Sequence, residues 1–225
     1  MEPGKSAFLF DLDGTLIDSV YEHVLAWHEA LEEEGIPLAI WRIHRRIGMS
    51  GGLFSNMLLR ETGMNITPER MESLRRRHAE HFKRRSHLVR ALPGARELLA
   101  RLDELGLPWA VATSGRIETA AAGLDMLGID RARVPVVTRD QVRHAKPDPD
   151  LFLTAAERLG VGMDRAVVVG DATWDMLAAR RARALGVGLL SGGYGENELE
   201  RAGAARVYED PADLLLHLDE VGGRS

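Results

Sequence analysis

The stretch FLFDLDGTLIDS, residues 8–19, places two aspartates directly after an apolar run. In an extended strand, residues two apart point to the same side, so Asp11 and Asp13 are expected to share one side of a strand end. Two neighbouring carboxylates raise each other's pKa and destabilise the fold unless a cation or a proton neutralises one of them. The pair therefore indicates chemistry rather than packing.

Polar residues also follow three other apolar segments. PWAVATSG ends with Thr113 and Ser114. HAKPDPD, which follows the apolar run at residues 134–138, carries Lys146, and AVVVGDATWD supplies Asp171 and Asp175. Clustered carboxylates suit a hard divalent cation, most commonly Mg²⁺. A metal ion beside a lysine and hydroxyl groups is also what a phosphoryl group requires. One carboxylate can then attack phosphorus while a second carboxyl protonates the leaving alcohol.

Short apolar runs between these polar residues predict buried parallel strands at Ala7–Leu12, Trp109–Thr113, Val134–Thr138, Ala166–Gly170 and Val187–Leu190. Helical periodicity separates them at Pro93–Leu105, Ile117–Leu127, Asp150–Leu159 and Trp174–Ala184, and a weak strand at Arg206–Tyr208 precedes a helix at Pro211–Leu218. Strands alternating with helices predict an α/β fold with a doubly wound parallel sheet. The glycine-rich SGGYGE, residues 191–196, is interpreted as a loop that could line the site rim.

Residues 16–90 interrupt this alternation with helical segments only. We expect them to form an inserted α-helical cap domain, and residues 1–15 and 91–225 to form the core domain. Ligands bind at the carboxyl ends of strands in open α/β sheets, so an insertion after the first strand is placed to act as a lid.

The overall composition is that of an ordinary globular protein, with a formal net charge of −5 and no cysteine among 225 residues. This excludes thiolate zinc sites and cysteine nucleophiles, and it gives no sign of a nucleic-acid or membrane partner. The basic segment RRRHAEHFKRR, residues 75–85, is interpreted as a solvated helix face. We expect a cytoplasmic protein that acts on a small molecule as a monomer or weak homodimer.

Four motifs carry a resemblance to a known family. DLDGTLIDS, VATSG, AKPDPD and VVVGDATWDM occur in the order and at the distances typical of the haloacid dehalogenase-like (HAD) superfamily. The chain resembles its helical-cap subgroup, which includes phosphoglycolate phosphatases and β-phosphoglucomutases. The resemblance covers nearly the whole chain and implies a Rossmann-like core with an inserted cap.

The resemblance also implies catalytic roles. Asp11 would be the nucleophile that forms an aspartyl-phosphate, and Asp13 would be the general acid and then the general base. Thr113 would donate a hydrogen bond to a phosphoryl oxygen, with the backbone N–H of Ser114 nearby as part of the substrate site. Lys146 would bridge Asp11 and the phosphoryl group.

A magnesium site is implied in the same way. Its ligands would be the carboxylates of Asp11 and Asp171 and the backbone carbonyl of Asp13. Asp175 would bind the ion directly or through water.

The cap contributes a glycine-rich turn within IHRRIGMSGGLFSN, residues 43–56. In relatives with this cap the corresponding turn helps to select the substrate, so His44, Arg45, Arg46 and Ser50 are candidates for recognition, with Arg45 and Ser50 taken as substrate-binding residues. The alternative is a solvated basic helix end, where arginine complements the helix dipole.

Four functions remain open, and a Mg²⁺-dependent phosphatase of a small phosphorylated metabolite leads them. A β-phosphoglucomutase-like phosphotransferase would use the same core residues, but such mutases usually have an arginine after the cap-turn serine, where this chain has Gly51. A 2-haloacid dehalogenase typically lacks the aspartate at position 13. A non-catalytic binding protein is less expected, because Asp11, Lys146 and Asp171 are all present.

Overall fold

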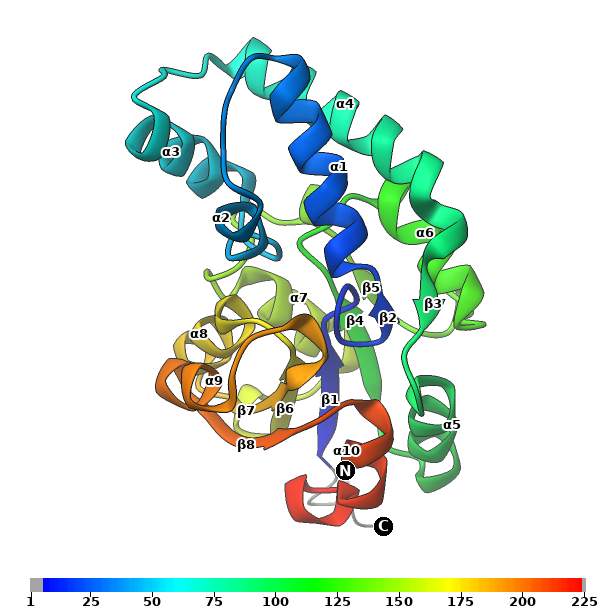
Figure 1. The fold of residues 1–225 in the computed structure, drawn as a ribbon. Helices are drawn as coiled ribbons and strands as arrows, with labels where there is room; N and C mark the ends of the chain where they lie inside the picture. The colour runs from blue at the N-terminus through cyan, green and yellow to red at the C-terminus, as the bar shows by residue number, and fades with distance from the viewer. Residues whose placement is uncertain (1–5, 224–225) are drawn as a thin grey trace.

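The core of the protein is a six-stranded parallel sheet with helices on both faces (Figure 1). The computed structural model describes residues 6–223, so the outermost residues of the predicted core segments, 1–5 and 224–225, lie outside it. The strand order is β5-β4-β1-β6-β7-β8, and every neighbouring pair is parallel. The strands are β1 (Ala7–Phe10), β4 (Trp109–Ala112), β5 (Val136–Val137), β6 (Ala166–Gly170), β7 (Leu185–Leu189) and β8 (Ala204–Tyr208). The predicted α/β fold class is confirmed.

Side-chain alternation along the central strand builds two hydrophobic layers. Phe8 and Phe10 of β1 point to one face of the sheet, where α5 (Ala95–Leu105), α6 (Ile117–Met126) and α10 (Pro211–Leu216) cover them. Leu9 points to the other face, against α7 (Asp150–Leu159) and α8 (Thr173–Ala182). The strand is thus buried on both faces, which explains why its sequence is continuously apolar.

Four further helices form a separate unit beside the carboxyl ends of the strands (Figure 1). They are α1 (Val20–Glu33), α2 (Ile40–His44), α3 (Gly51–Thr62) and α4 (Pro68–Arg85), and they enclose their own cluster around residues such as Leu31 and Leu74. Two short antiparallel strands, β2 (Ile17–Asp18) and β3 (Arg90–Ala91), connect this unit to the core. This arrangement agrees with an inserted cap, although the division at residues 16 and 90 stays a prediction.

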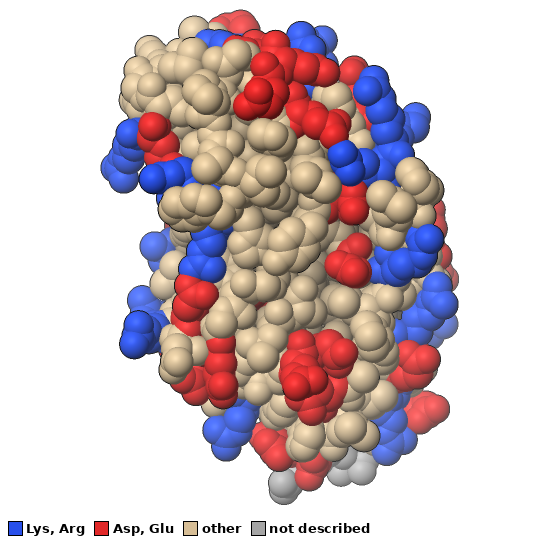
Figure 2. Space-filling model, in the orientation of Figure 1, with Lys and Arg blue, Asp and Glu red and all other residues tan. Residues whose placement is uncertain are grey.

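The packing of α1 against α4 uses charge as well as apolar surface. Glutamates on α1 pair with basic residues on α4: His81 Nε2 lies 3.0 Å from Glu33, and Arg85 pairs with both Glu22 and Glu29. Residues 75–85, interpreted from the sequence as a solvated face, therefore turn part of that face toward α1. On the face that Figure 2 shows, basic side chains lie mainly at the margins, acidic side chains also gather at the top and in the lower middle, and the centre is mostly uncharged.

Some elements differ from the sequence expectations. Two-residue strands such as β2 and β3 carry no periodic signal, so they were not predicted. The segment interpreted as a loop, residues 191–196, begins within a short 3₁₀ turn at Leu190–Gly192 and ends at the first residue of helix α9 (Glu196–Ala202). The other 3₁₀ turns lie at Ser86–Leu88, Arg139–Gln141, Met163–Arg165 and Leu218–Val221. No helix within the described chain is long and apolar enough to cross a membrane.

Candidate active site

A cavity of about 620 Å³ lies between the strand ends of the core and the four inserted helices. Its core side is lined by Asp11, Asp13, Thr113 and Ser114, all predicted from the sequence. Its helical side includes apolar and basic residues, among them Trp27, Arg46, Ile47, Met49, Phe54, Met71, Arg75 and Arg76. The cavity therefore brings the predicted catalytic aspartates into contact with a surface that could hold the rest of a substrate.

The two aspartates reach the cavity by a turn rather than by the strand itself. Strand β1 ends at Phe10, and the N–H of Asp11 still donates to the carbonyl of Val169 at 2.9 Å. Asp13 lies beyond the strand, in a turn that Gly14 closes with a φ of +83°. A Cβ on Gly14 would lie 2.5 Å from Asp171 Oδ2, so only glycine fits this turn.

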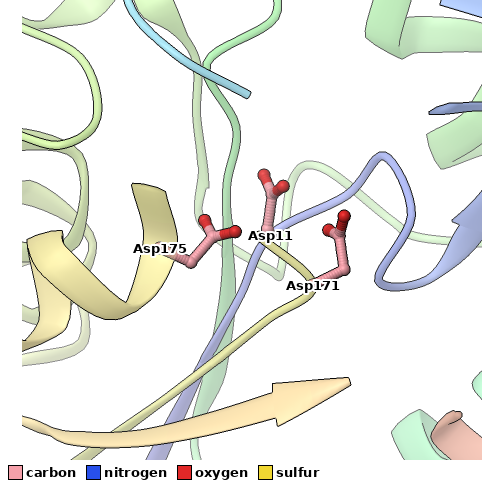
Figure 3. A group of neighbouring side chains, drawn as sticks. All are labelled: Asp11, Asp171 and Asp175. Carbon is pink, nitrogen blue, oxygen red and sulfur yellow. The ribbon is translucent and has the colours of Figure 1, made fainter. Parts of the chain in front are cut away.

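Three carboxylates meet beneath the cavity, from Asp11, Asp171 and Asp175 (Figure 3). One oxygen from each lies within 4.8 Å of the others, and all three side chains are buried. Burial, opposed by the charge of Lys146 and aided by the charges of Asp175 and Asp13, raises the pKa of Asp11 to about 7. Burial and then the charges of Asp175 and Asp11 raise the pKa of Asp171 well above its usual range. A bound cation would stabilise the ionised form of these three carboxylates, and carboxylate oxygens are ligands that suit Mg²⁺.

Lys146 supplies a fixed positive charge to the same cluster. Its side chain is fully buried, and Nζ lies 2.5 Å from Asp11 Oδ1 and 2.8 Å from Asp175 Oδ1. Burial opposes its charge, but the two aspartates outweigh this and raise the pKa of Lys146. Asp175 also accepts the N–H of Ala172 at 3.0 Å. Asp175 is therefore held mainly by Lys146 and the start of α8, while Asp171 is held by the Thr15 hydroxyl at 2.8 Å.

The hydroxyl residues after β4 face the cavity. Thr113 Oγ1 accepts the N–H of Gly115 at 2.9 Å, which leaves the hydroxyl hydrogen of Thr113 to donate elsewhere. The Ser114 hydroxyl oxygen is buried and has no hydrogen-bond partner within the described part of the chain. A buried polar atom without a partner is costly, and a bound ligand would relieve that cost.

Asp13 has partners that the sequence interpretation missed. Its Oδ1 accepts the Ser19 hydroxyl at 2.6 Å and lies 3.1 Å from His23 Nε2. His23 Nδ1 lies 3.1 Å from His78 Nε2 on α4. Burial would raise the pKa of Asp13, but the charge and hydrogen bond of His23, with that of Ser19, lower it overall. The available signal was the spacing of Ser19 and His23, one helical turn apart directly after the first motif.

The side chain of Asp13 does not belong to the carboxylate cluster among residues 6–223. The role predicted for it there involved its backbone carbonyl, and this stays a prediction.

The cap turn brings only some of its candidate residues to the cavity. Arg45 does not line the cavity: it pairs with Glu198 and stacks over the ring of Tyr194, both in the core. Ser50 is also outside the lining, and its N–H donates to the carbonyl of Lys146 at 2.8 Å. Arg46, another candidate from the sequence, does line the cavity. Adjacent residues of the turn after α2 thus make a core contact and a cavity contact.

The sequence of this chain matches a known family of hydrolases. A family model for haloacid dehalogenase-like hydrolases matches residues 5–183. This chain belongs to that family. Hexitol phosphatase A from Escherichia coli is 33% identical over 216 residues, 93% of this chain and 89% of that protein. N-acetylmuramic acid 6-phosphate phosphatase from Pseudomonas aeruginosa is 30% identical over 96% of this chain and 95% of that protein.

Solved structures agree with this assignment. The crystal structure of a hydrolase from Pseudomonas syringae is 60% identical, with a TM-score of 0.95 over 97% of this chain and all of that one. Phosphoglycolate phosphatases and a β-phosphoglucomutase structure are also similar, which confirms the predicted subgroup. This HAD-like hydrolase is therefore a phosphoric monoester hydrolase, and its curated relatives act on small phosphorylated compounds.

Proposed function

We propose that the protein is a Mg²⁺-dependent phosphatase that hydrolyses a small phosphorylated metabolite through an aspartyl-phosphate on Asp11. The observation that carries this proposal is the position of two carboxylates, Asp11 and Asp13, at the floor of one cavity above a buried lysine. The two carboxylates have different partners, because Asp11 contacts Lys146 while Asp13 contacts Ser19 and His23, and this difference supports separate roles for them.

In the first half-reaction, an Asp11 carboxylate oxygen attacks phosphorus and the bond from phosphorus to the leaving oxygen breaks. Asp13 gives its proton to that leaving oxygen, so an alcohol departs rather than an alkoxide. The Thr113 hydroxyl and the ammonium group of Lys146 stabilise the negative charge on the phosphoryl oxygens.

In the second half-reaction, water attacks the aspartyl-phosphate and Asp13 takes its proton. The bond between phosphorus and Asp11 breaks, which releases inorganic phosphate and restores both carboxyl groups. The buried position of the reaction, beneath the inserted helices, limits access by other nucleophiles.

Magnesium would be held by Asp11 and Asp171, with Asp175 nearby. These three carboxylates repel one another, and the single positive charge of Lys146 does not balance their negative charges. The ion would supply charge neutralisation for the phosphoryl oxygens and for the attacking carboxylate. Asp175, which already pairs with Lys146, would contribute by orienting that lysine as well as the ion.

The helical side of the cavity indicates the size of the leaving group. A volume of about 620 Å³ falls in the range of metabolite pockets and exceeds what a phosphate with a two-carbon acid needs. Trp27, Phe54 and Met71 provide an apolar wall, while Arg46 and Arg75 provide donors for hydroxyl or acidic substituents. We therefore place sugar and polyol phosphates first among candidate substrates.

Phosphate release is the test of this proposal. The purified protein would be incubated with hexose and hexitol phosphates, phosphoglycolate, nucleotides and p-nitrophenyl phosphate, each with Mg²⁺ and with excess chelator. We expect metal-dependent release that favours a sugar or polyol phosphate. Release that is equal with chelator, or absent from every compound, would contradict the proposal.

The same incubations distinguish the mutase alternative, which the similarity to a β-phosphoglucomutase structure keeps relevant. A mutase would convert one sugar phosphate isomer into another with little free phosphate, and this is detected by chromatography of the sugar phosphates. A cytoplasmic location, a monomeric or weakly dimeric state and the absence of nucleic-acid or membrane partners remain predictions.

A further inference from the structure

The glycine-rich segment SGGYGE and the first turn of α9 contact the cap turn from the core side. We call these residues, 191–198, the anchor segment. His44 Nε2 lies 2.8 Å from the carbonyl oxygen of Gly192, so this ring nitrogen donates a hydrogen bond to it. The Tyr194 hydroxyl donates to the carbonyl oxygen of Arg45 at 3.0 Å. The anchor segment thus bonds two successive residues at the end of α2, one through its side chain and one through its backbone.

Arg45 contributes the charged part of this contact. Its guanidinium group stacks over the Tyr194 ring, 4.2 Å from the ring centroid, and pairs with both carboxylate oxygens of Glu198. A two-pronged contact of this kind is stronger and more directional than a single hydrogen bond. Glu198 also accepts the N–H of Gly195 at 2.9 Å. The carboxylate is therefore held by the anchor segment itself as well as by the arginine.

The opposite side of the anchor segment is fixed by the core. The Ser191 hydroxyl donates to the carbonyl oxygen of Gly14 at 2.6 Å. A Cβ on Gly192 would lie 1.8 Å from Asp171 Oδ2, so the backbone of the segment lies directly against this carboxylate. The Tyr194 ring is buried in an apolar cluster with residues of α8 and α9. The segment therefore forms a fixed surface of the core, on which the cap turn rests.

Gly193 shows how closely the two parts of the protein approach each other. Its φ of +86° is in the left-handed region, and a Cβ there would lie 2.6 Å from the Tyr21 hydroxyl oxygen and 3.0 Å from His44 Nε2. Tyr21 and His44 both belong to the inserted helices, and their rings stack with centroids 5.3 Å apart. A larger residue at position 193 would therefore push these helices away from the core.

The cap turn is bonded to the core at its other end as well. The N–H of Ser50 donates to the carbonyl oxygen of Lys146 at 2.8 Å. The residues between the two contacts all line the cavity, namely Arg46, Ile47, Gly48 and Met49. Because the chain is bonded to the core on both sides of this stretch, the positions of residues 46–49 in the cavity depend on the two contacts.

We propose that the anchor segment selects substrates indirectly, by setting the position of residues 46–49 in the cavity. Tyr194 and Glu198 are then positioning residues, because neither lines the cavity. The effect on substrate choice rests on the proposed phosphatase function, whereas the anchoring of the cap turn does not. Loss of the anchor would weaken contacts between residues 46–49 and the leaving group, and it would leave Asp11 and Lys146 in place on the core.

The first test needs no catalytic activity. Trypsin cleaves after arginine, and the bonds that follow Arg45 and Arg46 lie at the anchored stretch. Glu198→Gln removes the charge with which Arg45 pairs but keeps both cleavage sites. We expect cleavage at these bonds, followed by mass spectrometry, to be ~5- to 10-fold faster in this variant than in the wild type, because local opening becomes easier. Tyr194→Phe should act in the same direction, because it loses the hydroxyl contact.

Glu33→Gln is the matched control for this measurement. Glu33 pairs with Arg77 at 2.5 Å, and its side chain is 42% exposed, against 40% for Glu198. This pair joins α1 to α4 within the inserted helices rather than to the core. We expect the rate of cleavage after Arg45 and Arg46 to stay within about twofold of the wild-type rate.

The second test measures how the enzyme binds its substrate. In Arg45→Met and in Glu198→Gln, we expect KM for the best sugar or polyol phosphate to rise ~10-fold and kcat to change less than about threefold, because the displaced residues contact the leaving group. The double variant should lose no more than the single variants, because the two side chains form one contact. Mg²⁺ affinity measured by calorimetry should equal that of the wild type, since the carboxylate cluster stays in place.

The outcomes separate the anchoring from the phosphatase function. A wild-type protein that releases phosphate from no compound contradicts the phosphatase, and the trypsin measurement still decides the anchoring. Equal cleavage rates in Glu198→Gln and the wild type, or an equal acceleration in Glu33→Gln, would overturn the anchoring. An unchanged KM in Arg45→Met and Glu198→Gln, additive effects in the double variant, or weaker Mg²⁺ binding would overturn the positioning role.

Discussion

Replacing Lys146 with methionine would remove the cation that lies between two buried carboxylates while nearly preserving side-chain volume. Nζ lies 2.5 Å from Asp11 and 2.8 Å from Asp175, and none of the lysine side chain is exposed. Breaking a buried ion pair by removing one partner costs about 3–5 kcal/mol, because the remaining charge is uncompensated. Loss of a donor to the phosphoryl oxygens should also lower kcat by ~10²–10³-fold.

The stability loss should depend on pH. The pKa of Asp11 is raised from 3.8 to about 7 even with Lys146 beside it, and Lys146 acts to lower it. Between those values the folded protein binds more protons than the unfolded chain, so stability falls as pH rises through this range. Without Lys146 the pKa of Asp11 should be higher still, so the pH range over which stability falls should extend upward. The variant should thus lose about 3 kcal/mol or more near pH 8 and less near pH 5.5.

Urea unfolding without metal at the two pH values measures this difference. Lys83→Met is the matched control, because Lys83 is exposed on α4 and its replacement should change the free energy of unfolding by less than about 0.5 kcal/mol. A Lys146→Met variant as stable as this control at both pH values would refute the assignment of Lys146 as the compensating charge. A loss that is larger at low pH would refute the sign of the Asp11 shift.

Further outcomes follow from the same geometry. Asp11→Asn should reduce turnover by at least ~10³-fold while the protein remains folded by circular dichroism, and near-normal turnover would contradict the nucleophile. Mg²⁺ should raise the thermal unfolding temperature of the wild type, and chelator should reverse this, if the folded carboxylate cluster holds the ion as proposed. Gly192→Ala would place a Cβ over the Asp171 carboxylate and should weaken Mg²⁺ binding ~10- to 100-fold by calorimetry. Gly195→Ala meets only an ordinary contact 3.5 Å away, so equal binding by both variants would contradict the steric argument.

The core of the fold could be predicted because its strands are buried on both faces. Continuous apolar runs such as Ala166–Gly170 coincide with β6, and polar residues after such runs lie at one edge of a parallel sheet whatever the details of packing. This is why Asp11, Thr113 and Asp171 could be assigned to one place without coordinates. The elements missed, β2, β3 and α9, are short or glycine-rich and have too few residues to show a period.

The sequence by itself determined which groups we propose to react. They are two aspartates after the first strand, a lysine, and the carboxylates after β6, and they lie at strand ends that local patterning defines. Only the tertiary structure decided what surrounds them. His23 and His78 are 55 positions apart and meet because α1 and α4 pack in one register. Arg46 lines the cavity while Arg45 pairs with the core, although the two are neighbours in the turn after α2. Such contacts depend on the angle and register between helices, which no local pattern of residues encodes.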